Sequence, residues 1–334
     1  MKLSLIKALV VAAAVFFAVP ANAATLKLGT LAPKGSPWHK ALEDLAAKWA
    51  KLSGGRVKLR IYPGGIAGDE PDMVRKMRIG QLHAAALTGA GLARIAQEVQ
   101  ALQMPMMFES DAELDHVRGK LRGKLEGALE AKGTRVLNWV DAGWIYFFTQ
   151  KPVVAPDDLK PLKLFTWVGD SAYVEAWRAS GYNPVPLPAT EIHTGLSSGL
   201  INAVPTTPLA ALANQWFGLA QNMTDMKWAP LVGATVISTR GWSRVPKGDR
   251  AKLLQAAADM GARLQPEIRK LDGEAIAVMK KHALKVHAVP DAVKAKWAQG
   301  ARQGYPRLVG TVVPKAIVDE VQRLTDAYRK SGGK

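Results

Sequence analysis

The sequence predicts an α/β protein of two domains, each with a mixed, mostly parallel sheet, joined by a hinge and followed by long C-terminal helices. The first ~65 residues after position 23 alternate as β-α-β-α-β, an order that requires a largely parallel sheet with helical crossovers. The alternation of strands and helices continues less regularly further along. No Pro-rich linker divides the chain, as expected when several segments cross between two domains.

The first 23 residues have the pattern of a secretory signal peptide. Lys2 and Lys7 supply positive charge, residues 8–19 are apolar, and 21–23 fit the small-x-small rule for cleavage. A membrane anchor is disfavoured, because twelve helical residues span about 18 Å of a roughly 30 Å hydrocarbon core. We therefore expect a periplasmic protein, cleaved after Ala23.

Composition narrows the class of protein. Removing the signal leaves 311 of 334 residues, and 48% hydrophobic with 22% charged residues is typical of a globular chain. The absence of cysteine excludes disulfides, thiolate metal sites and Cys nucleophiles. The formal net charge of +17 would suit nucleic acid, but the basic residues are dispersed, so we expect no nucleic-acid partner. Such a field instead favours anionic ligands or an anionic membrane face.

The first elements follow from alternation and capping. Residues 25–30 alternate as a strand, Ser36 is a candidate N-cap, and Pro37 suits the first position of a helix that Gly54 ends. Strands at 57–62 and 83–88 flank a helix at 69–79.

The remaining elements repeat this theme. We expect strands at 134–140, 145–149, 162–167, 183–187 and 234–239, and helices at 111–132, 171–180, 191–200, 209–217, 247–284, 291–301 and 314–330. Pro266 predicts a kink or turn within the longest helix. The first domain would comprise 24–143 plus about 234–280, and the second 144–233 plus about 281–334.

Enzyme motifs are weak. Residues 195–199 match G-x-S-x-G, but the apolar stripe of Ile192, Leu196 and Leu200 places Ser197 inside a helix rather than on the strand-to-helix turn that a nucleophile requires. The six histidines form no metal-binding spacing, and no phosphate or dinucleotide loop occurs. We predict no catalytic residues, no metal and no cofactor, with an exported hydrolase using Ser197 as the alternative.

Aromatic side chains are the positive signal for a binding site. Trp144 directly precedes a predicted strand. Tyr146, Phe165 and Trp167 lie on predicted strands, and the last is followed by a turn. Open α/β sheets bind ligands at such strand ends. Core packing is the alternative role for these rings.

At this point the chain resembles the substrate-binding protein of TRAP transporters, the DctP-type P subunit. The resemblance covers nearly the whole chain after the signal and is carried by short motifs in family order: 27–29, 61–65, 68–70, 77–82, 102–108, 157–163, 181–191 and 196–203. It implies the periplasmic-binding-protein fold, with a ligand cleft between two domains that close on binding. It also implies delivery of a small molecule to membrane permease subunits.

This sequence departs from the family where the ligand carboxylate is usually gripped. The family's arginine after D-L-K-x-L-K corresponds to Phe165, a second arginine to Tyr146, and a common asparagine to Thr206 or Thr207. A carboxylate buried against Phe165 without a charge partner would cost several kcal/mol. The resemblance thus implies a divergent subgroup with a more apolar or aromatic ligand, which can use a TPR-containing periplasmic partner. A lipid-type carrier without a permease is a further alternative. The expected ligand-binding residues are Trp38, Thr88, Trp144, Tyr146, Phe165, Trp167, Asp170, Thr206, Thr207 and Trp216.

Overall fold

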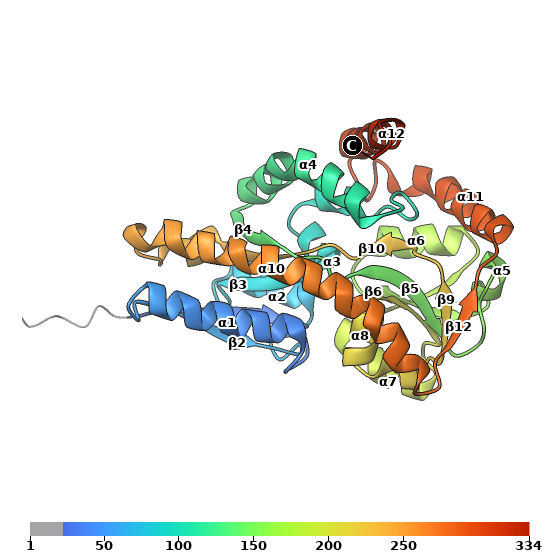
Figure 1. Ribbon diagram of the computed structural model, residues 1–334, viewed down its shortest axis with the longest axis horizontal. Helices are drawn as coiled ribbons and strands as arrows, with labels where there is room; N and C mark the ends of the chain where they lie inside the picture. Colours follow the sequence, from blue (N-terminus) through green and yellow to red (C-terminus); the bar gives the residue numbers. More distant parts are fainter. Residues whose placement is uncertain (1–22, 334) are drawn as a thin grey trace, which may run out of the picture.

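Two mixed β-sheets organise the chain (Figure 1). The computed structural model describes residues 23–333, so the expected signal at 1–23, except for its last residue, lies outside the described residues. The first sheet has the order β2-β1-β3-β11-β4. Its strands are β1 (Ala24–Thr30), β2 (Val57–Tyr62), β3 (Ala84–Thr88), β4 (Thr134–Trp139) and β11 (Gly233–Ser238). β1 pairs in parallel with β2 and β3, as the β-α-β-α-β order predicts, while β11 is antiparallel to β3 and β4.

The second sheet has the order β12-β9-β5-β8-β6-β7, with β10 paired to β5. Its strands are β5 (Trp144–Thr149), β6 (Lys163–Trp167), β7 (Asn183–Leu187), β8 (Ala203–Thr206), β9 (Asn222–Asp225), β10 (Ala229–Pro230) and β12 (Lys285–Ala288). β6 is parallel to β7 and β8, whereas β5 is antiparallel to β8 and β9. The chain therefore passes from the first sheet to the second between β4 and β5, and returns at β11.

Helices and 3₁₀ turns connect the strands of both sheets. The Oγ of Ser36 accepts a hydrogen bond from the N–H of His39, so the predicted cap is confirmed. The helices up to β11 are α1 (Pro37–Leu52), α2 (Glu70–Arg78), α3 (Gly89–Ala93), α4 (Asp111–Ala131), α5 (Pro156–Leu159), α6 (Ser171–Ala179), α7 (Ile192–Ser198) and α8 (Pro208–Ala213), with 3₁₀ turns η1 (Gln97–Gln103), η2 (Ala189–Glu191) and η3 (Trp216–Gly218).

One long helix links the two sheets. After α9 (Thr239–Ser243), α10 (Lys247–Lys280) contacts α1 and β4 at the first sheet and α8 beside the second. Figure 1 shows α10 running across the length of the molecule. Of the kink or turn predicted at Pro266, the turn is absent, because the proline lies inside a continuous helix. α11 (Asp291–Leu308) packs on α6, and α12 (Lys315–Lys330) packs on α4.

Two expected helices differ from the structure. The helix expected at 209–217 ends at Ala213, because Gln215 has a left-handed backbone (φ 59°) that α-helix excludes. Conversely, α11 continues to Leu308 with Pro306 inside it, beyond the expected end at 301.

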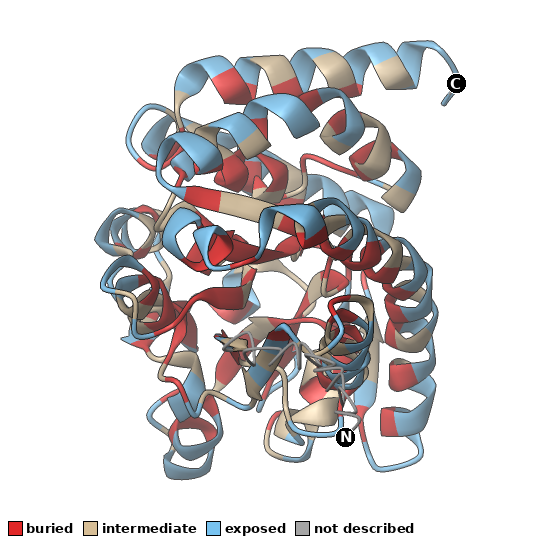
Figure 2. Cartoon of the chain, turned by 90° about the vertical axis from the view of Figure 1, so that its left-hand side faces the viewer, coloured by how far each residue is buried: buried red, intermediate tan, exposed pale blue. Residues whose placement is uncertain are grey.

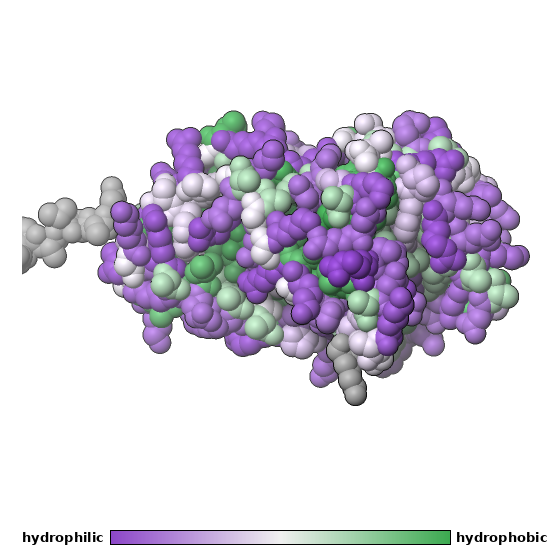
Figure 3. Space-filling view, turned by 90° about the horizontal axis from the view of Figure 1, so that it is seen from above, coloured by the Kyte–Doolittle hydropathy of each residue, from purple (hydrophilic) through white to green (hydrophobic). Residues whose placement is uncertain are grey.

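Buried residues concentrate on the strands and the inner faces of the helices (Figure 2). The larger core cluster surrounds the first sheet and reaches the second, and a smaller one groups Phe147 and Trp297 with Trp228. Phe147 stacks on Trp297 at 5.4 Å between ring centroids. Within residues 23–333, none of the helices combines the length and hydropathy needed to cross a bilayer. The face seen in Figure 3 is mostly hydrophilic, in keeping with the high charge.

Candidate ligand-binding site

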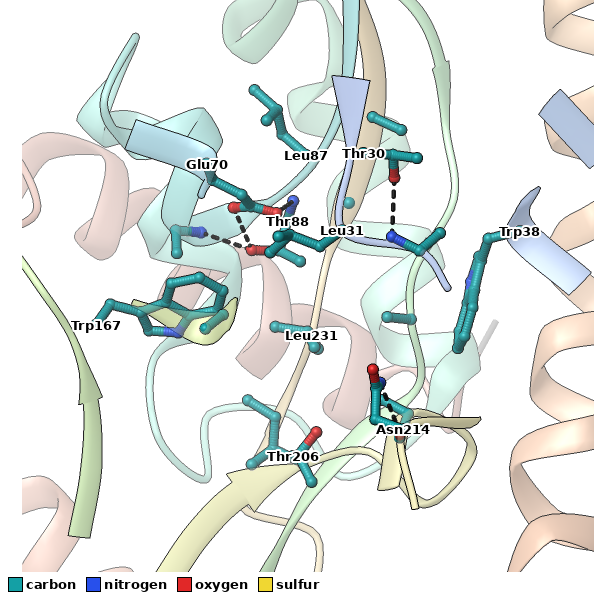
Figure 4. A pocket seen from close by; sticks show the side chains of 18 of the residues that line it. Thr30, Leu31, Trp38, Glu70, Leu87, Thr88, Trp167, Thr206, Asn214 and Leu231 are labelled. Atoms are coloured by element: carbon teal, nitrogen blue, oxygen red, sulfur yellow. Dashed lines mark hydrogen bonds between the residues drawn. The ribbon is translucent and has the colours of Figure 1, made fainter. Parts of the chain in front are cut away.

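A cavity of about 600 Å³ lies between the ends of the two sheets. From the first sheet it is lined by the ends of β1 and β3, at Thr30 and Thr88, and by the loop after β1. From the second it is lined by β6 and by Thr206 at the end of β8. Figure 4 shows Trp167 on one side and Trp38 on the other, with Leu231 and Thr206 between them. This is the position at which open α/β sheets bind ligands.

Aromatic and aliphatic side chains form most of the wall. Phe165 is 2% exposed, and its ring meets the half-buried ring of Trp167 edge-on at 5.7 Å. Trp38 comes from α1 and Trp216 from η3, just after the backbone reversal at Gln215. The wall is therefore largely apolar, with tryptophan rings from both the first and the second half of the cavity.

A buried carboxylate supports the floor of the cavity. Oε1 of Glu70 accepts the backbone N–H of Thr88 at 2.8 Å, and Oε2 accepts the Thr88 hydroxyl at 2.8 Å and the N–H of Gly91 at 2.7 Å (Figure 4). Burial raises the pKa of Glu70 to about 7, opposed by these hydrogen bonds. Because its oxygens are occupied by the start of α3, Glu70 fixes the strand-to-helix turn rather than presenting a free anion.

Few charged groups line the cavity. Among the described lining residues the basic side chains are Lys34 and His193, both exposed, and none is an arginine. The acidic ones are Glu70 and Asp170. Asp170 caps α6 by accepting the N–H of Tyr173 at 3.3 Å, and burial raises its pKa. No guanidinium belongs to the described lining, although that of Arg94 lies at its edge, next to Val168.

Seven of the ten sequence-predicted residues line this cavity: Trp38, Thr88, Phe165, Trp167, Asp170, Thr206 and Trp216. Three do not. The indole N–H of Trp144 donates to Asp111, and Lys227 lies over its ring. Tyr146 packs in the core, where burial raises its pKa. Thr207 is buried as the N-cap of α8, its hydroxyl oxygen accepting the N–H of Ala210.

Sequence reasoning missed several polar residues of the lining, three of which have unpartnered side-chain atoms. Gln103, Asn138 and Thr166 line the cavity, and each has a buried side-chain oxygen that no hydrogen-bond partner reaches within residues 23–333. No motif marks them. The one available signal was a polar residue inside a predicted strand, as at Asn138 within residues 134–140.

Contacts across the mouth join the two sheets. Oδ2 of Asp69, which precedes α2, accepts the N–H of Ala189, which follows β7, at 3.0 Å. The guanidinium of Arg94 donates to the carbonyl of Val168 at 3.2 Å. The two halves therefore meet beside the cavity.

Ser197 is not arranged for catalysis. It lies inside α7, exposed, and its hydroxyl donates to the backbone carbonyl of His193 at 2.9 Å. In the described part of the chain, no three His, Asp or Glu side chains gather closely enough to hold a metal ion.

Comparisons with known proteins agree with this architecture. Residues 28–309 match the bacterial extracellular solute-binding proteins of family 7, the DctP type. A solute-binding protein of Roseobacter denitrificans is 28% identical over 255 residues, which are 74% of this chain and 76% of that protein.

Two crystal structures show the same fold. The sugar-acid-binding protein of Advenella mimigardefordensis, in complex with galactonate, gives a TM-score of 0.85 at 20% identity, covering 92% of this chain and 99% of that one. A TRAP periplasmic solute-binding protein of Ralstonia eutropha, with bound (S)-2-acetolactate, gives 0.84 at 20% identity, covering 91% and 99%. The predicted α/β fold with two mixed sheets is thereby confirmed.

Proposed function

Because the chain belongs to the DctP family of bacterial extracellular solute-binding proteins, which are not enzymes, we propose that it is the periplasmic subunit of a TRAP-type secondary transporter. It closes over one small molecule and delivers it to the membrane permease subunits. The cavity between the two sheets, with contacts across its mouth, carries the proposal. An exported hydrolase is disfavoured by the helical setting of Ser197.

The ligand we propose is more apolar or aromatic than a simple dicarboxylate. The observation behind this is Phe165, buried in the cavity wall at the position where the family resemblance expects an arginine. Two proteins of the same fold hold the anions galactonate and acetolactate. Binding such an anion against Phe165 would leave its charge poorly compensated. We therefore place this chain in a subgroup that lacks the carboxylate clamp.

The two sheets suggest how the chain divides into domains. Residues 24–143 plus about 234–280 form one domain and 144–233 plus about 281–334 the other, hinged at the crossing segments. Seven lining residues would contact the ligand: Trp38, Thr88, Phe165, Trp167, Asp170, Thr206 and Trp216.

The signal would be cleaved after Ala23, and a TPR-containing periplasmic protein would be a further partner. N-terminal sequencing of the exported protein tests the cleavage, and co-purification with an identified TPR protein tests the partner.

The decisive experiment identifies what the protein carries. Protein purified from the periplasm is denatured, and the released small molecules are identified by mass spectrometry. We expect one aromatic or otherwise largely apolar compound per chain. Added back to the stripped protein, it should reduce the radius of gyration by small-angle scattering. At 100 times its dissociation constant, it should stabilise the fold by about 2.7 kcal/mol. Recovery of a dicarboxylate or sugar acid would refute the ligand class, and no binding by any candidate would refute the function.

A further inference from the structure

The cavity extends inward between the first sheet and the helices that cover it. Leu42 of α1 and Met260 and Leu264 of α10 line it there, and all three are buried. Four paired residues form a row across the sheet and face these helices. Thr30 is paired with Ala86, Ala86 with Thr235, and Thr235 with Asn138. Directly opposed residues on neighbouring strands point to the same face. We call this space, bounded by these seven residues, the inner chamber.

A β-bulge sets the position of Asn138 in this row. Val236 pairs with Val136, but Thr235 pairs with Asn138, so Leu137 is the extra residue. Without the bulge, the residue opposite Thr235 would be Leu137, and the row would end on an aliphatic side chain. Bulges redirect side chains next to functional sites. Here the bulge places a carboxamide at the end of an otherwise small or apolar row.

The carboxamide of Asn138 has no partner. The residue is 3% exposed, and within the described chain neither its Nδ2 nor its Oδ1 makes a hydrogen bond. Its side chain packs against Gly261 of α10, where only glycine fits, because an added Cβ would lie 2.7 Å from the Cβ of Asn138. Buried carboxamides are almost always hydrogen-bonded. A donor and an acceptor fixed side by side in a ligand cavity are therefore available to a ligand.

We propose that the inner chamber binds an uncharged group that both donates and accepts hydrogen bonds, a hydroxyl or a carboxamide, and that Asn138 recognises it. The ligand then carries this group at the inner end of an apolar body that lies along Phe165 and Trp167. This inference rests on the proposed function, since it assigns one end of the same ligand.

The chemistry of the chamber excludes a charged group at that end. None of its seven residues is ionisable, and Leu42, Met260 and Leu264 cover one side. An ion placed there would lose its hydration without gaining a counter-charge. A hydroxyl or carboxamide instead matches the donor and acceptor of Asn138, and the hydroxyls of Thr30 and Thr235 stand in the same row.

The first test uses the sign of a stability change. Asn138→Leu keeps the branched shape of the side chain and removes an unpaired carboxamide, so the melting temperature of the ligand-free protein should rise or stay unchanged. Asn222→Leu is the matched control. Asn222 is also buried, but its Nδ2 donates to Thr149 and Gln150, and its Oδ1 contacts His287, so its loss should lower the melting temperature. A comparable drop for Asn138→Leu would overturn the proposal, because it would mean that Asn138 serves the fold.

The second test uses two probes of similar size, benzamide and methyl benzoate. Benzamide donates and accepts hydrogen bonds, whereas methyl benzoate only accepts. We expect benzamide to bind about tenfold more tightly to the unsubstituted protein, and this preference to vanish in Asn138→Leu. Equal binding of both probes, or a preference that survives the substitution, would overturn the assignment of Asn138.

The outcomes separate this inference from the proposed function. If the co-purified ligand binds the unsubstituted protein and Asn138→Leu with equal affinity, the inner chamber is not its polar subsite, yet the transport function stands. If neither that ligand nor the probes bind the unsubstituted protein, the proposed function fails. In that case a lowered melting temperature of ligand-free Asn138→Leu would also refute the role of Asn138.

Discussion

The carboxylate of Asp69 joins the two halves of the molecule through the backbone N–H of Ala189, at 3.0 Å from Oδ2. The same side chain caps α2, with Oδ1 accepting the N–H of Glu70 at 2.8 Å. One oxygen therefore caps a helix of the first half, and the other contacts the second half. Because the two tasks fall on different atoms, a substitution can separate them.

Asp69→Asn should weaken ligand binding while leaving the unliganded fold nearly intact. The amide oxygen can still cap α2, but the amide nitrogen cannot accept from Ala189, so closure loses a charge-assisted hydrogen bond. We expect the dissociation constant of the co-purified ligand to rise roughly tenfold or more, measured by calorimetry. Asp69→Ala removes the cap as well and should also destabilise the ligand-free protein by about 1 kcal/mol. Unchanged affinity in Asp69→Asn would show that this contact does not contribute to closure.

Gly91→Ala should destabilise the protein, although alanine favours helix over glycine. An added Cβ would lie 2.6 Å from Oε2 of Glu70 and 3.1 Å from Leu87, so the carboxylate beneath the cavity would have to move. We expect a loss of about 1–3 kcal/mol in the free energy of unfolding by urea denaturation. Gly119→Ala, on an exposed face of α4 with nothing near the new methyl, is the control and should stabilise by up to about 1 kcal/mol. A gain in both variants would contradict the crowding at Glu70.

Most of the fold was predictable because its main elements carry their own signals. Residues 25–30 and 57–62 alternate and became β1 and β2, and Ser36 capped α1 as expected. The four-residue strands β8, β9 and β12 are too short to show a period and form only because neighbours pair with them. The reversal at Gln215 gave no signal either, since its left-handed conformation depends on the surrounding structure.

The site was predictable only in part. Aromatic residues at strand ends indicated Phe165 and Trp167, both of which reach the cavity. Trp144 is just as aromatic but turns toward Asp111, and no local pattern distinguishes the two cases. Asn138 depends on a bulge between β4 and β11, which are about a hundred residues apart in sequence. Such pairing is a tertiary property.

Asp272→Asn should flatten the pH dependence of stability. Oδ1 of Asp272, on α10, accepts the N–H of Leu209 at 2.9 Å, and burial raises the pKa of this carboxyl to about 7. In the unfolded chain the carboxyl titrates near its ordinary value of about 4. Between pH 4 and 7 the folded state thus holds a proton that the unfolded state has released, so stability from this group is full below pH 4 and is lost as pH rises to 7.

The measurement is the difference in unfolding free energy between the unsubstituted protein and Asp272→Asn, followed from pH 4 to pH 8. The difference should fall by an amount on the order of 4 kcal/mol and level off above pH 7. Asp157→Asn is the control, because its hydrogen bond to Lys160 lowers the pKa of Asp157 and moves its titration below this range. A difference for Asp272→Asn that stays constant or increases with pH would contradict the raised pKa.

Phe165→Arg should convert the cavity into one that prefers carboxylates. The guanidinium would replace the ring of Phe165, which is 2% exposed in the cavity wall. The acidic residues of the described lining that could pair with it are Glu70 and Asp170. A buried cation without a partner is costly, so the ligand-free variant should melt at a lower temperature. Succinate or galactonate would supply the missing charge and bind the fork of the guanidinium. Either anion at millimolar concentration should therefore raise the melting temperature of Phe165→Arg and leave the unsubstituted protein unchanged.

Phe165→Met distinguishes charge from packing in this experiment. Methionine removes the ring and disturbs the contact with Trp167 at 5.7 Å, but it adds no cation. The methionine variant should lose affinity for an aromatic ligand and gain none for succinate. If the anions stabilise the unsubstituted protein as strongly as Phe165→Arg, the carboxylate of the anion must be held elsewhere in the cavity. Lys34, in the loop after β1, is the basic lining residue to substitute next. That result would remove the physical reason for an apolar ligand, because the charge that Phe165 does not match would already be compensated.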